Sequence, residues 1–270
     1  MFLGNNKIKS YFSKLIKSEA LSHAYIFYGI EGIGKKTVAL EISESMAGPA
    51  KVNPDLRILD KGRDEIHIAD IRELRNFIHM TPFGKWKIAI LNNAHNLGHD
   101  ASNTLLKILE EPPGRSIIFL ITHLPEMLLN TVISRCQRIR FAPLKEEEIF
   151  NYLLAEKKVK RETAAAAAKL AAGSLGLALE LAGDFDNFQK NINLLNRLAK
   201  SDFKERFEAS KVISSDADAM KRTVRDWLIY SSSLPDKPFV RELLHLNNLI
   251  SRPQFNHKLF FENFLARIDA

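Results

Sequence analysis

The sequence predicts an α/β protein in which a parallel β-sheet domain is followed by helical units. Short apolar runs alternate with helical patterns through roughly the first half of the 270 residues, which is typical of βαβ units. The first run leads into a glycine-rich loop and then a helix, which is the context of a phosphate-binding loop. Strand patterns end after residue 144, and only helical patterns follow. These three observations decide the fold class.

Five short apolar runs are the predicted strands, at residues 25–28, 56–59, 87–91, 117–121 and 139–141. Between them, helical patterns predict helices at residues 36–46, 68–79 and 100–109. The last of these helices must end before Pro112 and Pro113, because proline lacks the N–H that a helix interior needs. The order of these elements predicts a P-loop-type α/β domain over residues 1–142.

The remaining helical patterns fall into two groups. Helices are expected at residues 146–158, 161–172 and 175–182, with a turn at Gly173 and Ser174 between the last two. From residue 185 to the end we expect five amphipathic helices. We therefore predict a small helical domain over residues 143–184 and an all-α domain over residues 185–270.

Composition narrows the functional class. The chain is 46% hydrophobic and 26% charged, and no apolar run approaches the roughly 20 residues that a membrane-spanning helix needs. It has one cysteine, so an internal disulfide framework and a four-cysteine zinc module are excluded. We expect no membrane association and, since the N-terminal residues lack an apolar signal segment, a cytoplasmic location. The net charge of +7 favours polyanionic partners such as nucleic acid.

The glycine-rich loop lacks one group that a magnesium-dependent phosphate site needs. In the usual pattern two glycines let backbone N–H groups wrap a phosphate, a lysine reaches the phosphates, and the next Ser or Thr binds Mg²⁺. Lys36 fills that Ser/Thr position, and Thr37 comes one residue late, about 100° further round the helix. The candidate nucleotide-binding residues are Gly29, Gly32, Gly34, Lys35, Lys36 and Thr37. They predict that ATP or ADP binds without hydrolysis, if a nucleotide binds at all.

The second signature of a P-loop enzyme is also incomplete. In an active enzyme an acidic residue ends the strand that lies here at residues 87–91 and orients Mg²⁺, and a following Glu acts on the attacking water. This chain has Asn92 and Asn93 instead. An amide is nearly the same size as a carboxylate, so it keeps the hydrogen bonds and loses both the metal-binding charge and the base.

Four segments resemble the clamp-loader subunits of bacterial DNA polymerase III, most of all the delta-prime type. They are LSHAYIF at residues 21–27, IREL through TPFG at residues 71–84, ASNTLLKILEEPP at residues 101–113 and ISRCQR at residues 133–138. The resemblance implies an AAA+ P-loop parallel-sheet domain, a small helical lid and an all-α collar that packs with other subunits. In this family such a ring of five opens the sliding clamp and sets it on primed DNA during DNA replication.

The resemblance also assigns residues. Arg135, in Ser134-Arg135-Cys136, is expected to act in trans as an arginine finger on a neighbouring subunit's ATP; a surface arginine with a local partner is the alternative. Arg72 is a candidate contact to the DNA backbone. Leu177 stands where the lid of the family carries an arginine. Residues 47–55 are short and without cysteine, so the inserted zinc module of the family is missing and no metal is expected.

Other chemistry-bearing residues receive plainer interpretations. Glu110 and Glu111 are rejected as a catalytic pair, because adjacent residues on a helix diverge by about 100°. His95 has no second ligand at helical spacing, and Thr122 at a strand end is a nucleotide-sensing residue or an ordinary terminal threonine. Cys136 lies among arginines that would lower its pKa, but no paired histidine makes it a nucleophile.

The hypothesis is a stator subunit of the DNA polymerase holoenzyme without ATPase activity of its own. Its expected partners are the other clamp-loader subunits, the sliding clamp and primed DNA, and no cofactor is required. Two alternatives stay open: an active ATPase motor subunit of the same type, and a stand-alone DNA-binding protein on the same scaffold.

Overall fold

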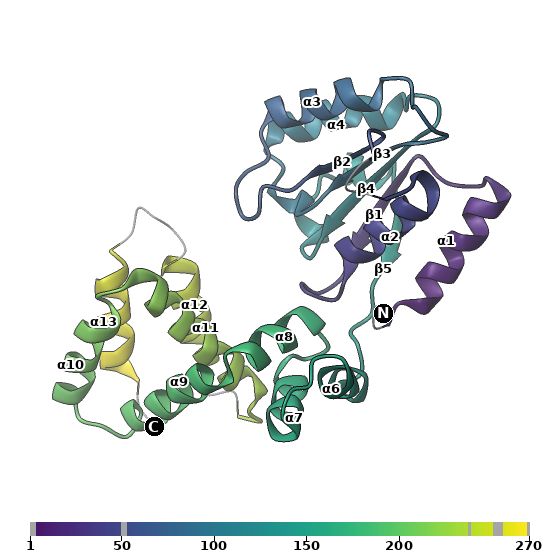
Figure 1. Ribbon diagram of the computed structural model, residues 1–270. Coiled ribbons are helices and arrows are strands. Elements are labelled where there is room, and N and C mark those ends of the chain that lie inside the picture. Colours follow the sequence, from purple (N-terminus) through teal and green to yellow (C-terminus); the bar gives the residue numbers. More distant parts are fainter. Residues whose placement is uncertain (1–3, 50–52, 237–238, 251–255, 269–270) are drawn as a thin grey trace. The chain divides into compact units, whose positions relative to one another are not determined.

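The computed structural model describes residues 4–49, 53–236, 239–250 and 256–268. They form two compact units (Figure 1): residues 1–152 with residues 172–177, and residues 153–171 with residues 178–270. The predicted division into three domains is not resolved by this grouping and stays a prediction. Among the described residues, no helix combines the length and the apolar composition that crossing a membrane requires.

The first unit contains a five-stranded parallel sheet in the order β2-β3-β4-β1-β5. Its strands are β1 (Ala24–Tyr28), β2 (Leu56–Leu59), β3 (Lys87–Leu91), β4 (Ser116–Thr122) and β5 (Gln137–Arg140). Its helices are α1 (Asn6–Ser18), α2 (Lys35–Ala47), α3 (Ile68–Ile78), α4 (His99–Glu110) and the short α5 (Asn130–Ile133). The predicted α/β fold class is confirmed.

Alternation along the central strands gives the sheet two apolar faces. Ala24 and Ile26 of β1 join the core beneath α3 and α4, whereas Tyr25 and Phe27 join the core beneath α1 and α2. Figure 1 shows α3 and α4 on one side of the sheet and α1 and α2 on the other. Because both faces are covered, the central strands consist almost wholly of apolar residues, and this made them easy to predict.

A buried ion pair fixes the start of β3. The Nζ of Lys87 lies 3.0 Å from Oδ1 of Asp55, and each side chain is only 3% exposed. The same carboxylate accepts hydrogen bonds from the backbone N–H groups of Phe83 and Gly84, 3.0 and 2.7 Å away. Burial opposes ionisation of Asp55, but these donors and Lys87 together hold its pKa below its usual value. Asp55 therefore ties both the loop before β3 and the first residue of β3 to the start of β2.

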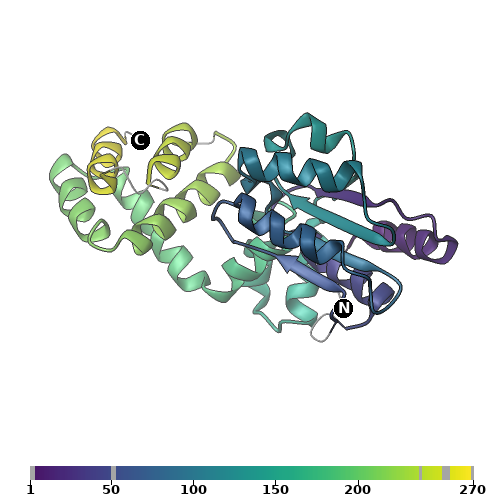
Figure 2. The ribbon, with the colours of Figure 1, turned by 90° about the horizontal axis from the view of Figure 1, so that it is seen from above.

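Eight further helices follow the sheet in the described part of the chain. They are α6 (Glu146–Ala155), α7 (Arg161–Leu170), α8 (Leu175–Gly183), α9 (Phe185–Leu198), α10 (Phe203–Ile213), α11 (Ala217–Ser233), α12 (Val240–Ile250) and α13 (His257–Arg267). The last five are the helices that the sequence predicts after residue 185, and they gather into a bundle in both views (Figure 1 and Figure 2). Trp227 is fully buried there, stacks on Phe261 and donates to the Asn191 carbonyl over 2.7 Å.

Candidate functional site

A pocket of about 270 Å³ lies at the carboxyl ends of β1, β3 and β4. This edge is where parallel α/β sheets bind their ligands, because the loops that leave the strands open toward it. The lining residues are Glu31, Gly32, Gly34, Lys35, Lys36, Thr37, Asn92, Asn93, Ile121, Thr122 and His123. The structure thus brings the glycine loop and the amide pair to one pocket. Arg72, Ser134 and Arg135 are not among the residues that line it.

Lys35 is directed onto its own loop. Its side chain is nearly buried, with 7% of the residue exposed, and Nζ donates to the carbonyl oxygens of Gly29 and Ile30 over 2.7 and 2.6 Å. Burial lowers the pKa of Lys35 to about 8, against an opposing effect of the Glu31 carboxylate. A neutral amine still has two N–H donors, one for each carbonyl. The lysine therefore holds the loop together even where it carries no charge.

The turn before α8 closes on the same loop. The hydroxyl of Ser174 donates to the carbonyl of Glu31 over 2.8 Å, and the N–H of Gly176 donates to the carbonyl of Gly32 over 2.8 Å. Gly32 has φ of 77°, and a Cβ on it would lie 2.4 Å from the Ser174 hydroxyl. Glycine is needed here for contact with the chain itself, so its presence alone does not imply a phosphate. Leu177, in place of the expected arginine, donates its N–H to the Ser174 hydroxyl.

The loop nevertheless keeps the polarity of an anion site. Its carbonyls at residues 29–32 accept hydrogen bonds from Lys35, Ser174 and Gly176. Within the described part of the chain, the backbone N–H groups of residues 30–34 donate to no other backbone group outside regular elements. Successive N–H groups at a helix N-terminus attract anions.

A carboxylate that sequence reasoning missed, Asp60, neutralises Lys36. Nζ of Lys36 lies 2.7 Å from Oδ2 of Asp60, and Nδ2 of Asn92 donates to that same oxygen over 3.0 Å. The N–H of Gly62 donates to the other oxygen over 3.1 Å. Burial opposes ionisation of Asp60, but these three donors lower its pKa below the usual value. The signal in the sequence was an acidic residue directly after β2, at the same edge of the sheet.

Asn93 has its own reason to be an amide. Its backbone is left-handed, with φ of 53°, a conformation that asparagine tolerates better than most residues. Its Nδ2 donates to the carbonyl of Gly62 over 2.8 Å. A carboxylate in this position would place a negative oxygen against that carbonyl. Both amides of the pair therefore act as donors, a role that aspartate or glutamate cannot fill.

Thr122 ends β4 inside the chain's own hydrogen-bond network. Its hydroxyl accepts from the N–H of Leu124 over 3.0 Å and lies 3.2 Å from Nδ1 of His95. The rings of His95 and His123 meet edge to face, with centroids 4.3 Å apart. Burial lowers the pKa of both histidines. The positive charge near the pocket at neutral pH therefore comes from lysines.

Arg135 lies on the turn between α5 and β5. Its Nη1 donates to the carbonyl of Thr131 over 3.0 Å and to the hydroxyl of Ser134 over 3.3 Å. Its Nη2 lies 2.8 Å from Oε1 of Glu110, at the end of α4. The side chain keeps 36% of its surface exposed. The local partner that the alternative interpretation expects is thus present, and the guanidinium remains accessible.

Cys136, Arg72 and Thr37 were also considered as functional residues in the sequence. The expectation for Cys136 was wrong in direction, because burial raises the pKa of this thiol to about 12. Arg72 is exposed on α3, between the buried Ile71 and Leu74. Thr37 lines the pocket, and the predicted direction of its hydroxyl stays a prediction. In the described ranges, no group of three or more His, Cys, Asp and Glu side chains is placed to hold a metal ion.

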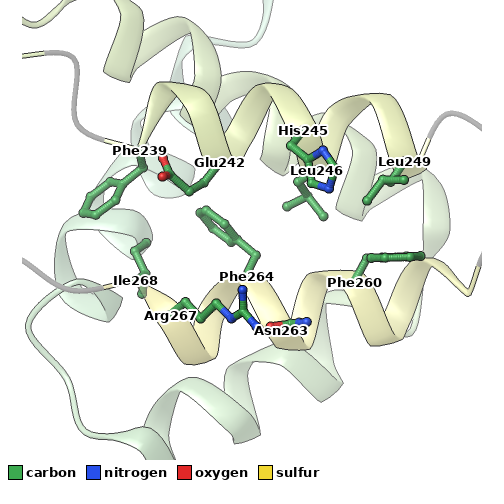
Figure 3. A pocket seen from close by; sticks show the side chains of 10 residues that line it. All are labelled: Phe239, Glu242, His245, Leu246, Leu249, Phe260, Asn263, Phe264, Arg267 and Ile268. Carbon is green, nitrogen blue, oxygen red and sulfur yellow. The ribbon is translucent and has the colours of Figure 1, made fainter.

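The second unit has a pocket of its own, about 440 Å³, between α12 and α13. Figure 3 shows Phe264 of α13 pointing toward α12, with Glu242 and His245 on the facing helix. The pocket is lined by aromatic and charged residues, and none of them is a candidate site residue predicted from the sequence.

The strand order and the glycine loop together define a P-loop module of the AAA+ type. Solved structures agree. A DNA polymerase III gamma subunit-related protein from Thermotoga maritima superposes with a TM-score of 0.62 at 25% identity, covering 94% of this chain and 97% of that one. RuvB of Thermotoga maritima superposes with a TM-score of 0.53 at 14% identity over 71% of this chain and 65% of that one, a likeness of fold alone.

The family follows from the sequence match. The family model described as DNA polymerase III, delta subunit, matches residues 4–145, more than half of the chain, and the chain belongs to this family. It is 34% identical to DNA polymerase III subunit delta' of Bacillus subtilis, over 52% of this chain and 48% of that protein. It is 36% identical to subunit delta' of Escherichia coli, over 56% of this chain and 46% of that protein. The matched region thus spans about half the length of these relatives.

Proposed function

We propose that this chain is a delta-prime-type stator subunit of a DNA polymerase III clamp loader. It does not hydrolyse ATP, and it donates Arg135 to the ATP site of a neighbouring subunit. Membership of the family supports the assignment to the clamp loader. The residues of the chain's own pocket support the absence of ATP hydrolysis, and the exposure of Arg135 supports its action on a neighbouring subunit.

The chain's own pocket is unsuited to a catalytic magnesium ion. Mg²⁺ requires oxygen ligands in near-octahedral geometry, and P-loop enzymes supply a Ser or Thr hydroxyl and an Asp carboxylate. Here those sequence positions hold Lys36 and Asn92. The nearby Asp60 carboxylate already accepts from an ammonium group, an amide and a backbone N–H. To coordinate Asp60, a metal ion would have to displace the Lys36 ammonium group from this carboxylate.

The pocket also lacks a group that could activate water. Asn93 stands in place of the acidic residue, and its amide donates to a carbonyl rather than accepting a proton. In the described part of the chain, the backbone N–H groups of residues 30–34 donate to no other backbone group outside regular elements, so ATP or ADP can be held without turnover and without Mg²⁺. No cofactor is required for this role, and no zinc enters it.

One observation carries the proposal: the groups that would act on this chain's own nucleotide are replaced, whereas Arg135 is retained and 36% exposed. An arginine finger stabilises the charge that develops on the transferring phosphate of another subunit. It needs neither a metal nor a base from its own chain. The retained Ser134-Arg135-Cys136 segment would have no evident use in a stand-alone DNA-binding protein.

The remaining partners follow from the same role. The other clamp-loader subunits would pack against this chain in the ring, and the ring would act on the sliding clamp and primed DNA. Arg72, exposed on α3, is the candidate contact to a backbone phosphate. Such a contact adds affinity without sequence preference.

The test is ATP turnover by the purified chain and by the complex reconstituted with its partner subunits, the clamp and primed DNA. The isolated chain should not hydrolyse ATP. In the complex, Arg135→Ala should abolish turnover at the one adjacent site, since fingers contribute about 10³ to 10⁵ in rate. Arg138→Ala is the matched control, because this exposed arginine of β5 stacks over Tyr28, 4.9 Å from the ring centroid.

Three results would contradict parts of the proposal. Hydrolysis by the isolated chain that Lys35→Ala removes would favour the motor-subunit alternative. Turnover of the complex that is equal for Arg135→Ala and Arg138→Ala would exclude the finger. Failure to co-purify with any subunit that carries complete motifs would favour the stand-alone DNA-binding protein.

A further inference from the structure

We propose that Glu110 is a positioning residue for Arg135: its carboxylate holds the guanidinium so that the remaining N–H donors face the phosphate of the neighbouring subunit. This inference rests on the proposed function of Arg135. It also gives a role to the acidic end of the LLKILEEPP segment, which the reaction does not otherwise use.

The guanidinium is anchored from two elements. Glu110 is the last residue of α4 and lies 2.8 Å from Nη2, whereas the Thr131 carbonyl of α5 accepts from Nη1 over 3.0 Å. The Ser134 hydroxyl accepts from Nη1 over 3.3 Å. The flexible side chain is therefore held at its tip by groups from both α4 and α5.

The anchored guanidinium still has donors to offer. It carries five N–H groups in a fixed plane. The contacts of Arg135 within the described residues involve Nη1 and Nη2, so Nε–H and a second hydrogen on Nη2 remain for anionic oxygens. A guanidinium can bind a carboxylate on one edge and a phosphate on another. Fixing the tip in advance lowers the entropy that is lost when the partner's nucleotide is engaged.

Glu110 and Glu111 are neighbours with different surroundings. Glu110 pairs with Arg135, whereas Glu111 is an exposed residue directly after α4. Within the described residues, Glu111 forms no ion pair. Substitution of Glu111 is therefore a matched control, because it removes the same charge one residue away and leaves the ion pair between Glu110 and Arg135 in place.

The experiment measures kcat and KM for ATP in the reconstituted complex with the clamp and primed DNA. Glu110→Ala should lower kcat at the one adjacent ATP site by about two- to five-fold, which is the range that an exposed ion pair supports. KM should be unchanged, because the finger acts on the transition state. Glu110→Gln, whose amide oxygen still accepts a hydrogen bond, should lose less, and Glu111→Ala should match the wild type.

A double-mutant cycle separates positioning from a general structural effect. In an Arg135→Ala background, Glu110→Ala should cause no further loss of kcat. The inference would be overturned if Glu110→Ala lowered kcat equally in both backgrounds. It would also be overturned if Glu110→Ala left kcat unchanged or raised it, or if Glu111→Ala lowered kcat as much as Glu110→Ala. If Arg135→Ala lowers turnover and Glu110→Ala does not, the positioning role alone fails; if Arg135→Ala has no effect, the proposed function fails with it.

Discussion

Replacement of Lys35 by methionine tests whether this lysine is a structural part of the glycine loop. The change keeps most of the side-chain length and removes the hydrogen bonds of 2.7 and 2.6 Å to the Gly29 and Ile30 carbonyls. Hydrogen bonds from charged donors contribute about 1.5–3 kcal/mol each. Against this, a pKa lowered from 10.5 to about 8 corresponds to roughly 3 kcal/mol for burying the charge. The expected net loss of unfolding free energy at pH 7 is about 1–2 kcal/mol.

The pH dependence gives the sharper test. The pKa of Lys35 is about 8 in the folded chain and 10.5 for an unperturbed lysine, so between these values the unfolded state binds more protons. The stability of the wild type should therefore rise with pH in this window, relative to Lys35→Met. Below pH 8 the cost of burying the charge is fully present. Between pH 7 and pH 10 the difference between the two proteins should widen by up to roughly 3 kcal/mol.

Urea unfolding followed by tryptophan fluorescence can measure this difference. The chain has two tryptophans, Trp86 before β3 and Trp227 in α11, so a Trp227→Phe background reports on the first unit alone. Lys36→Met is the matched control, because the Lys36 side chain is 42% exposed and its ion pair contributes about 0–1 kcal/mol. Parallel stability curves for wild type and Lys35→Met from pH 7 to pH 10 would refute the reasoning.

Substitutions at three further positions test other parts of the first unit. Asp55→Ala leaves the buried Lys87 ammonium without its carboxylate and should cost about 3–5 kcal/mol in urea unfolding; a loss below about 1 kcal/mol would contradict the buried pair. Asn93→Asp removes the donor to the Gly62 carbonyl, places a carboxylate against it, and should cost about 1–3 kcal/mol. Asn93→Gly also loses the donor but tolerates the left-handed backbone and should cost less; the reverse order would contradict the repulsion between a carboxylate and that carbonyl. Arg72→Ala should weaken binding of the complex to primed DNA equally for all sequences and reduce the salt slope by about 1, as measured by fluorescence anisotropy; a sequence-dependent loss would argue against a phosphate contact.

The fold was largely predictable because the central strands are buried on both faces. The predicted strands at residues 56–59 and 87–91 coincide with β2 and β3. The prediction for β1 differs by one residue at its start, and the prediction for β4 differs by one residue at each end. The prediction was least accurate for β5, expected at residues 139–141 and observed at Gln137–Arg140. This strand pairs only with β1 at the edge of the sheet, and its exposed polar residues hide the apolar pattern.

The candidate site was predictable only in part. The glycine loop and the amide pair follow strands of one parallel sheet, so their meeting in one pocket could be expected from the sequence. Asp60 also follows a strand of this sheet, but its bonds to Lys36 and Asn92 were missed, because a position at the sheet edge does not show which side chains meet there. The pKa of Cys136 was mispredicted because sequence shows charged neighbours and does not show burial.

By itself, the sequence determined the α/β class, the order of the motifs and the presence of Lys36, Asn92 and Asn93, from which the loss of magnesium ligands is predicted, because residue identity and periodicity are local properties. Only the tertiary structure decided which groups satisfy one another. It turned Lys35 onto its own loop, paired Lys36 with Asp60, and brought Glu110 to Arg135. The physical reason is that a charged or polar group takes the nearest complementary partner in space, and for Lys36 and Arg135 that partner comes from an element distant in sequence.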